Sequence, residues 1–144
     1  MKTRTKLPIG AAAAALAACG IAQARDCSES TLEGLYVFSA TGFNIVQGAA
    51  QPKAVTEFIR FNGNGTLTVP AATVSLDGVV IRSPPNGTGS YTVSSDCTGS
   101  LQFNDRAHAS FDLFIAADGH TIYMNQTGGA LPGVLQGRAE SLSD

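Results

Sequence analysis

The 144-residue chain has no tryptophan, two histidines and three cysteines, and only 14% of its residues are charged. The two histidines, His108 and His120, are isolated, and no His-x-His or Cys-x-x-Cys spacing occurs, so the sequence predicts no metal site. No serine has the Gly-x-Ser-x-Gly spacing of a nucleophile elbow. We therefore expect no cofactor, and we predict no catalytic residue.

Long apolar runs and clusters of basic residues are also missing. A membrane-spanning helix needs about 20 consecutive apolar residues, and no segment of this chain reaches that length. Beyond residue 24 there are six basic and 11 acidic residues, which gives a net charge of −5. Because phosphate binding requires clustered Lys and Arg, this balance argues against nucleic acid or an anionic membrane as the partner.

Residues 1–24 have the features of an export signal. A basic start precedes a short Ala-rich stretch, and Ala22-Gln23-Ala24 matches the small-x-small cleavage pattern. We expect cleavage after Ala24, which leaves residues 25–144 as one exported domain, periplasmic or secreted. As an alternative, Leu16-Ala17-Ala18-Cys19 resembles the bacterial lipobox, in which Cys19 would be lipidated and would anchor the protein to a membrane.

Under either processing route, Cys27 and Cys97 remain as an isolated pair. An oxidising compartment favours a disulfide between two such cysteines. The alternative is two free thiols or a metal site, although no clustered histidines or further cysteines supply the other ligands.

Glycine-containing turns recur along the chain at intervals of roughly 8–15 residues, which is typical of consecutive β-hairpins. Gly and Asn tolerate the positive φ that tight hairpin turns require. The predicted turns are Asn62-Gly63-Asn64-Gly65, Asp77-Gly78, Asn86-Gly87-Thr88-Gly89, Asp96-Cys97-Thr98-Gly99 and Asp118-Gly119.

Between the turns, apolar and polar residues alternate with a period of two, which predicts half-buried strands. We expect strands at residues 32–44, 54–61, 66–76, 79–82, 90–94, 101–103, 107–116, 122–125 and 134–142, and a loop at residues 45–52. Proline cannot donate a hydrogen bond to a β-ladder. We therefore expect the strand that contains Pro70 to be split, to have a bulge or to lie at a sheet edge.

Short connections throughout favour a single up-and-down antiparallel β-barrel of about eight strands, since closure removes exposed sheet edges. A two-sheet sandwich is the alternative.

Several stretches resemble a group of exported bacterial proteins with an allene oxide cyclase barrel-like domain. The matching pieces are residues 27–36, 61–67 and 89–99, together with Phe111-Asp112-Leu113, Asp118-Gly119 and Gln126-Thr127-Gly128. The resemblance implies a calycin-like eight-stranded barrel, in which the cysteine pair ties the N-terminal lead-in to a later hairpin. Gly34-Leu35-Tyr36 is also similar to the Gly-x-aromatic opening of calycin barrels, which implies that Arg138 packs across the ring of Tyr36.

A barrel of this size has room for packed side chains or one small ligand. The residues predicted to line or fill the lumen are Ile59, Phe61, Tyr91, Phe111, Leu113, Ile115, Ile122 and Met124. We expect the polar residues His108, Ser110 and Asp112 to point outward.

Glu57 shares a strand face with Ile59 and Phe61, whereas Arg60 belongs to the opposite face. We favour a position for Glu57 at the barrel rim, exposed to water. The alternative is a buried lumen acid with a raised pKa, able to act as an acid or base.

Two functional classes follow. We prefer a protein that binds a small apolar molecule or has a structural role, because no constellation of titratable residues stands out. The alternative, which the resemblance implies, is a cofactor-free cyclase or isomerase that orients an apolar substrate in the lumen.

Overall fold

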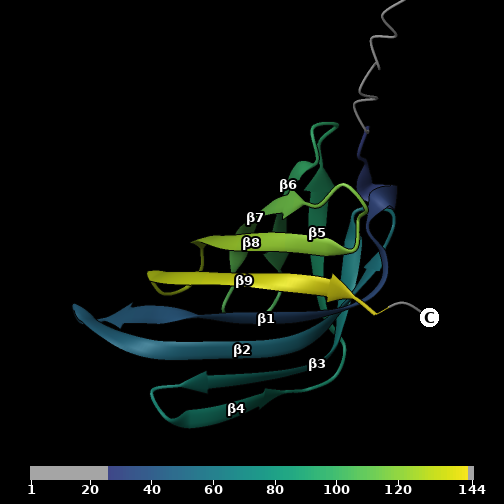
Figure 1. Cartoon of the computed structure of the whole chain (residues 1–144). Coiled ribbons are helices and arrows are strands. Elements are labelled where there is room, and N and C mark those ends of the chain that lie inside the picture. Colours follow the sequence, from purple (N-terminus) through teal and green to yellow (C-terminus); the bar gives the residue numbers. More distant parts are fainter. Residues whose placement is uncertain (1–25, 143–144) are drawn as a thin grey trace, which may run out of the picture.

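The computed structural model describes residues 26–142, so the predicted signal segment and Cys19 lie outside the described range. Strands make up most of this range (Figure 1). In chain order the elements are a short 3-10 helix η1 (Glu29–Thr31) and the strands β1 (Glu33–Val46), β2 (Ala49–Asn62), β3 (Thr66–Leu76), β4 (Val79–Ser83), β5 (Gly87–Val93), β6 (Thr98–Phe103), β7 (Ser110–Ile115), β8 (Thr121–Gly128) and β9 (Gly133–Ser141).

Eight of these strands close an antiparallel up-and-down barrel. The sheet order runs β2-β1-β9-β8-β7-β6-β5-β3-β4, and a further pairing between β2 and β3 closes the circle. The prediction of a single all-β barrel of about eight strands is therefore confirmed, and the sandwich is excluded. Closure pairs the backbone groups of the strands without leaving long free edges.

The ninth strand, β4, exists because prolines interrupt the pairing around β3. Residues 66–69 of β3 pair with β5, and residues 72–76 pair with β4. Between them, Val69 and Pro70 face the single β2 residue Ile59, which is the arrangement of a β-bulge. The predicted interruption at Pro70 is thus confirmed, and the bulge accommodates a residue that has no N–H to donate.

Because Pro84 and Pro85 end β4, the strands β4 and β5 lie end to end along the same edge of β3. The prediction of a hairpin turn at residues 86–89 was therefore wrong. Asn86 does have a positive φ of 77°, but the chain continues along β3 instead of reversing. Within the described range, the outer edge of β4 has no strand partner.

The prediction of a loop at residues 45–52 was also wrong, because β1 and β2 form one continuous hairpin that reaches past the other strands (Figure 1). Gln47 and Gly48 have φ values of 51° and 81°, as a two-residue type I′ turn requires. Pro52 lies one residue beyond the last β2–β3 pair, Lys53 with Leu76. Proline has no N–H group, and at this position no residue of β3 requires one for pairing.

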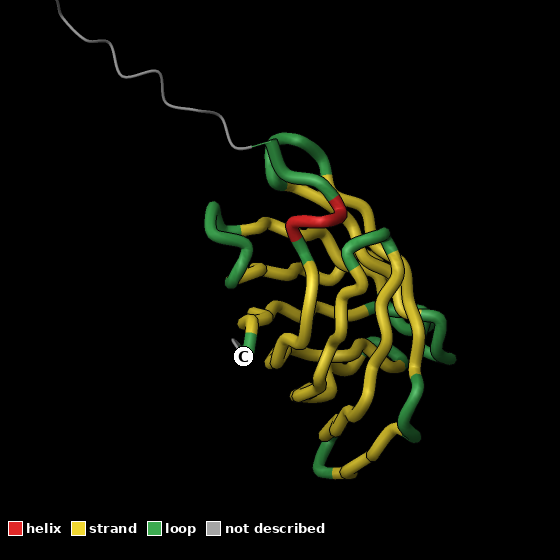
Figure 2. Tube along the Cα trace, turned by 90° about the vertical axis from the view of Figure 1, so that its right-hand side faces the viewer, coloured by secondary structure: helices red, strands yellow, loops and turns green. Residues whose placement is uncertain are grey.

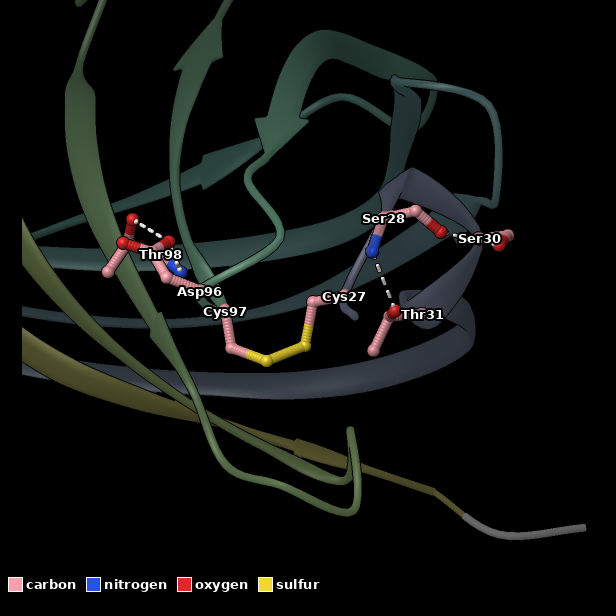
Figure 3. Close-up of a disulfide and its surroundings, with 7 residues drawn as sticks. All are labelled: Cys27, Ser28, Ser30, Thr31, Asp96, Cys97 and Thr98. Atoms are coloured by element: carbon pink, nitrogen blue, oxygen red, sulfur yellow. Dashed lines mark hydrogen bonds between the residues drawn. A yellow bond between two sulfur atoms is a disulfide. The ribbon is translucent and has the colours of Figure 1, made fainter. Parts of the chain in front are cut away.

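One end of the barrel is closed by the N-terminal lead-in, which Figure 2 shows as a red turn against the strand ends. Ser28 N donates to Thr31 Oγ1 at 3.0 Å within this turn, and Leu32 follows it into the core. A disulfide joins Cys27 to Cys97 in the β5–β6 turn (Figure 3), which confirms the predicted pairing. The bond closes a loop of 70 residues, worth about 4 kcal/mol of stability on chain-entropy grounds.

Three aromatic rings pack beneath this lead-in. Phe61 meets Tyr36 and Tyr91 edge to face, with ring centroids 5.1 and 4.9 Å apart. The Tyr91 hydroxyl lies 2.9 Å from the carbonyl oxygen of Glu29, and the Tyr36 hydroxyl donates to the carbonyl oxygen of Gly119 at 2.7 Å. Both phenols thus find polar partners while their rings fill the core. We call this disulfide-bonded half of the barrel the sealed end.

Candidate functional site

The opposite end of the barrel holds a cavity of about 910 Å³, which we call the open-end cavity. Its wall is mainly apolar and comes from the hairpins that extend beyond the barrel and from the β6–β7 loop. The apolar lining residues are Phe38, Val55, Val74, Leu76, Ile81, Pro84, Phe103, Ala107, Ala109, Phe111 and Leu135. The polar lining residues are Asn44, Lys53, Glu57, Arg82, Ser83, Asn104, Asp105 and Arg106.

Strand β2 supplies three consecutive inward positions of this wall. Lys53, Val55 and Glu57 alternate with the exposed residues Ala54 and Thr56. A period of two places every second side chain of a strand on the same face, so the charges of Lys53 and Glu57 face the cavity along with the methyl groups of Val55.

Glu57 is half-buried and lies on the inward face between Phe38 of β1 and Ala72 of β3. Burial first, and then the negative charge of Asp105, raise the pKa of this carboxyl from 4.5 to about 7, while Lys53 opposes the shift. Near neutral pH the group can therefore both accept and donate a proton. The preferred prediction of a water-exposed rim position was wrong: Glu57 faces the lumen, because the extended hairpins continue the barrel wall past this residue.

Lys53 is also half-buried, and burial lowers the pKa of its ammonium group, while Asp105 and Glu57 act in the opposite direction. Asp105 itself is exposed in the β6–β7 loop, where its carboxylate accepts hydrogen bonds from the backbone N–H groups of Ala107 and His108, each at 3.0 Å. These bonds hold the loop in place beside the cavity. The site thus combines two carboxyl groups, one ammonium group and the guanidinium groups of Arg82 and Arg106 against a mainly apolar wall.

A side pocket of about 90 Å³ adjoins the open-end cavity, and Asn44, Lys53, Ala107 and Ala109 line both. Asn44 is only 7% exposed. Gln126, on β8, donates from Nε2 to the carbonyl oxygen of Gly128 at 3.1 Å, but its Oε1 atom is buried without a partner. Buried polar atoms without partners are rare in folded proteins.

All eight residues predicted to line or fill the lumen are buried. Only one of them, Phe111, reaches the open-end cavity, whereas the other seven lie in the packed core outside its lining. The cavity therefore lies toward the open end, and the middle of the barrel is filled by packed side chains. The polar lining residues Asn44, Lys53, Asp105 and Gln126 were missed, although Lys53 has the same strand parity as Glu57 and was open to prediction on that ground.

The residues predicted to point outward are exposed to different degrees. Asp112 is exposed on β7, and Ser110 is half-buried. His108 is exposed but lies in a loop, because β7 begins at Ser110 and the β6–β7 connection occupies the start of the expected strand. Arg60 is exposed on the outer face of β2.

The predicted packing of Arg138 on Tyr36 was wrong. Arg138 is 54% exposed and forms an ion pair with Glu140 at 2.9 Å on the outer face of β9. Tyr36 points into the core, where its ring contacts Phe61. The barrel wall separates the two side chains, because Arg138 alternates with the buried Ala139.

Within residues 26–142, no three His, Cys, Asp or Glu side chains gather as a metal site would require. No helix in this part of the chain has the length and apolar character needed to cross a bilayer.

Comparisons of the chain with protein-family models, with curated proteins and with solved structures found no match.

Proposed function

We propose that the protein binds a small, mainly apolar molecule in the open-end cavity. The observation that carries this proposal is the cavity itself, whose volume of about 910 Å³ falls within the range of known ligand sites. Its apolar wall would remove the ligand from water, and burial of apolar area is the main source of affinity for such molecules. The few polar groups would fix its orientation.

A pair of variants tests this binding. Val74 lines the cavity on β3, whereas its neighbour Thr73 points outward. Val74→Trp fills part of the cavity and should weaken binding of a neutral apolar dye, N-phenyl-1-naphthylamine, at least tenfold. Thr73→Trp adds the same ring outside and should leave the affinity unchanged. Equal binding by both variants, or none by the unmodified protein, would refute the proposal.

Glu57 supports a second candidate, a cofactor-free cyclase or isomerase. A carboxyl group whose pKa lies near 7 within an apolar cavity is suited to proton transfer, and Lys53 nearby could stabilise a developing negative charge. This candidate agrees with the resemblance to allene oxide cyclase barrel-like domains. Incubation with a lipid extract, followed by mass spectrometry, would separate the two. Molecules recovered unchanged support binding, and isomers lost in Glu57→Gln support catalysis.

We also propose that the protein is exported. The Cys27–Cys97 disulfide is characteristic of oxidising compartments. Intact-mass analysis of the protein from a bacterial host would test the two processing routes. A chain starting at Arg25 supports cleavage after Ala24, and a diacylated Cys19 supports a lipoprotein. A reduced, unprocessed chain in the cytoplasm would contradict export.

A further inference from the structure

The side pocket beside the open-end cavity combines a few polar side chains with small residues. Its polar side chains are Asn44, Lys53 and Gln126, and the rest of its wall is Ala107, Ala109, Gly129, Ala130 and Leu131. The small residues leave about 90 Å³, room for one functional group of a few atoms but not for a bulky one. Since the pocket shares four lining residues with the larger cavity, a molecule in that cavity can extend a group into it.

The available hydrogen bonds are mixed in kind. Gln126 Oε1 can only accept, and its amide nitrogen is already engaged with Gly128. The Lys53 ammonium can only donate, and the Asn44 amide can do both. A bound group that satisfies all three side chains must therefore donate and accept at the same time.

The ionic alternatives satisfy these side chains less well. An anion could accept from Lys53 in the pocket, and Arg82 and Arg106 line the main cavity beside Glu57 and Asp105, but an anion has no proton to donate to Gln126 Oε1. A cation in so small a pocket would lie close to the positive charge of Lys53 and would be repelled by it. The group that remains is neutral, small, and both a donor and an acceptor.

We infer that the side pocket recognises a hydroxyl group, so that the molecule bound in the open-end cavity is an apolar alcohol. This inference rests on the proposed binding function and adds the class of ligand. The hydroxyl proton goes to Gln126 Oε1, and the hydroxyl oxygen accepts from Lys53 or Asn44. A ligand of the same shape that lacks the hydroxyl proton leaves Gln126 Oε1 without a hydrogen bond. A site with a buried unpaired acceptor discriminates strongly against such a ligand.

Competition with N-phenyl-1-naphthylamine tests the inference with the purified full-length protein and four probes of matched chain length. These probes are decan-1-ol, decyl methyl ether, decanoate and decylammonium. Decan-1-ol should displace the dye at a concentration at least tenfold lower than each of the other three. The ether is the sharpest comparison, because it can accept a hydrogen bond but cannot donate one.

Variants locate the preference. Gln126→Leu should reduce the preference for decan-1-ol over the ether to less than twofold while dye binding is retained. The matched control, Asn125→Leu, changes the neighbouring exposed position of β8 and should keep the full preference. If Gln126→Leu does not fold, Asn44→Ala provides the second variant, and it should reduce the preference at least threefold.

The outcomes distinguish the inference from the function on which it rests. Dye binding without a preference for the alcohol would overturn the inference and mean that the side pocket holds only water. The proposed binding of apolar molecules would then still stand. Tighter binding of decanoate or decylammonium would overturn it in favour of an ionic ligand. No dye binding at all would remove the proposed function itself.

Discussion

The two ends of the barrel are built from the same eight strands but differ in what their side chains do. At the sealed end, Tyr36, Phe61 and Tyr91 contact one another and the lead-in closes the barrel with a disulfide. At the open end, the inward side chains leave a cavity that contains charged groups. The comparison indicates that the sealed end provides stability, which allows the open end to keep polar groups and empty volume that cost stability.

Phe61 gives the largest test of this division. Phe61→Ala removes a ring that is 1% exposed and contacts two others, so it should lower the free energy of unfolding by about 5 kcal/mol. Phe103→Ala, at the edge of the cavity, should cost at least about 1 kcal/mol less, because water can enter the space it leaves. Urea denaturation measures both. Equal losses would mean that the two ends share the stability evenly.

The disulfide provides the next test. Cys27→Ala combined with Cys97→Ala should lower the free energy of unfolding by about 4 kcal/mol, since the unfolded chain regains the freedom of a 70-residue loop. The bond lies at the sealed end, so apolar dye binding at low temperature should be retained wherever the variant stays folded. Loss of binding in a folded variant would show that the two ends are coupled.

Glu57 makes the open end sensitive to pH. Its pKa is raised from 4.5 to about 7, so the folded state holds a proton that the unfolded state has released between these values. The free energy of unfolding should therefore fall as the pH rises from 4.5 to 7, by about 3 kcal/mol for a shift of this size. Glu57→Gln should flatten this part of the profile. An unchanged profile in the variant would place the titrating group elsewhere.

Tyr36 and Arg138 give the smallest effects and test the sealed end against the barrel exterior. Tyr36→Phe leaves the buried Gly119 carbonyl without its donor and should cost about 1–2 kcal/mol. Arg138→Ala breaks an exposed ion pair and should cost less than about 0.5 kcal/mol. A larger loss for Arg138→Ala would indicate that the outer face contributes more than its exposure suggests.

Local sequence signals were sufficient for the architecture. Turn residues such as Asp77-Gly78 adopt the positive φ that the hairpins need, and the alternation that groups Ile59 with Phe61 correctly predicted an inward face. The cysteine pair was open to prediction because only two cysteines follow the expected signal. These features depend on neighbours in the chain, which is why a single sequence contains them.

The candidate site depended on contacts that no local pattern encodes. The bulge opposite Ile59 shifts the phase of β3, so inward positions change from Leu67 and Val69 to Ala72 and Val74. A prediction that continues strict alternation through the bulge assigns the residues after it to the wrong face of the strand. Likewise, Glu57 is a lumen acid because the β1–β2 hairpin extends past it, and that length follows from pairing between strands.

Alternation, turn chemistry and the isolated cysteine pair thus specified a β-barrel with a disulfide, because these are properties of adjacent residues and of composition. The cavity, the approach of Asn44 to Gln126 and the protonation of Glu57 arise from closure of the barrel, which brings residues far apart in sequence to one end. Burial and electrostatic coupling act through space, so they become definite only when the strands have found their partners.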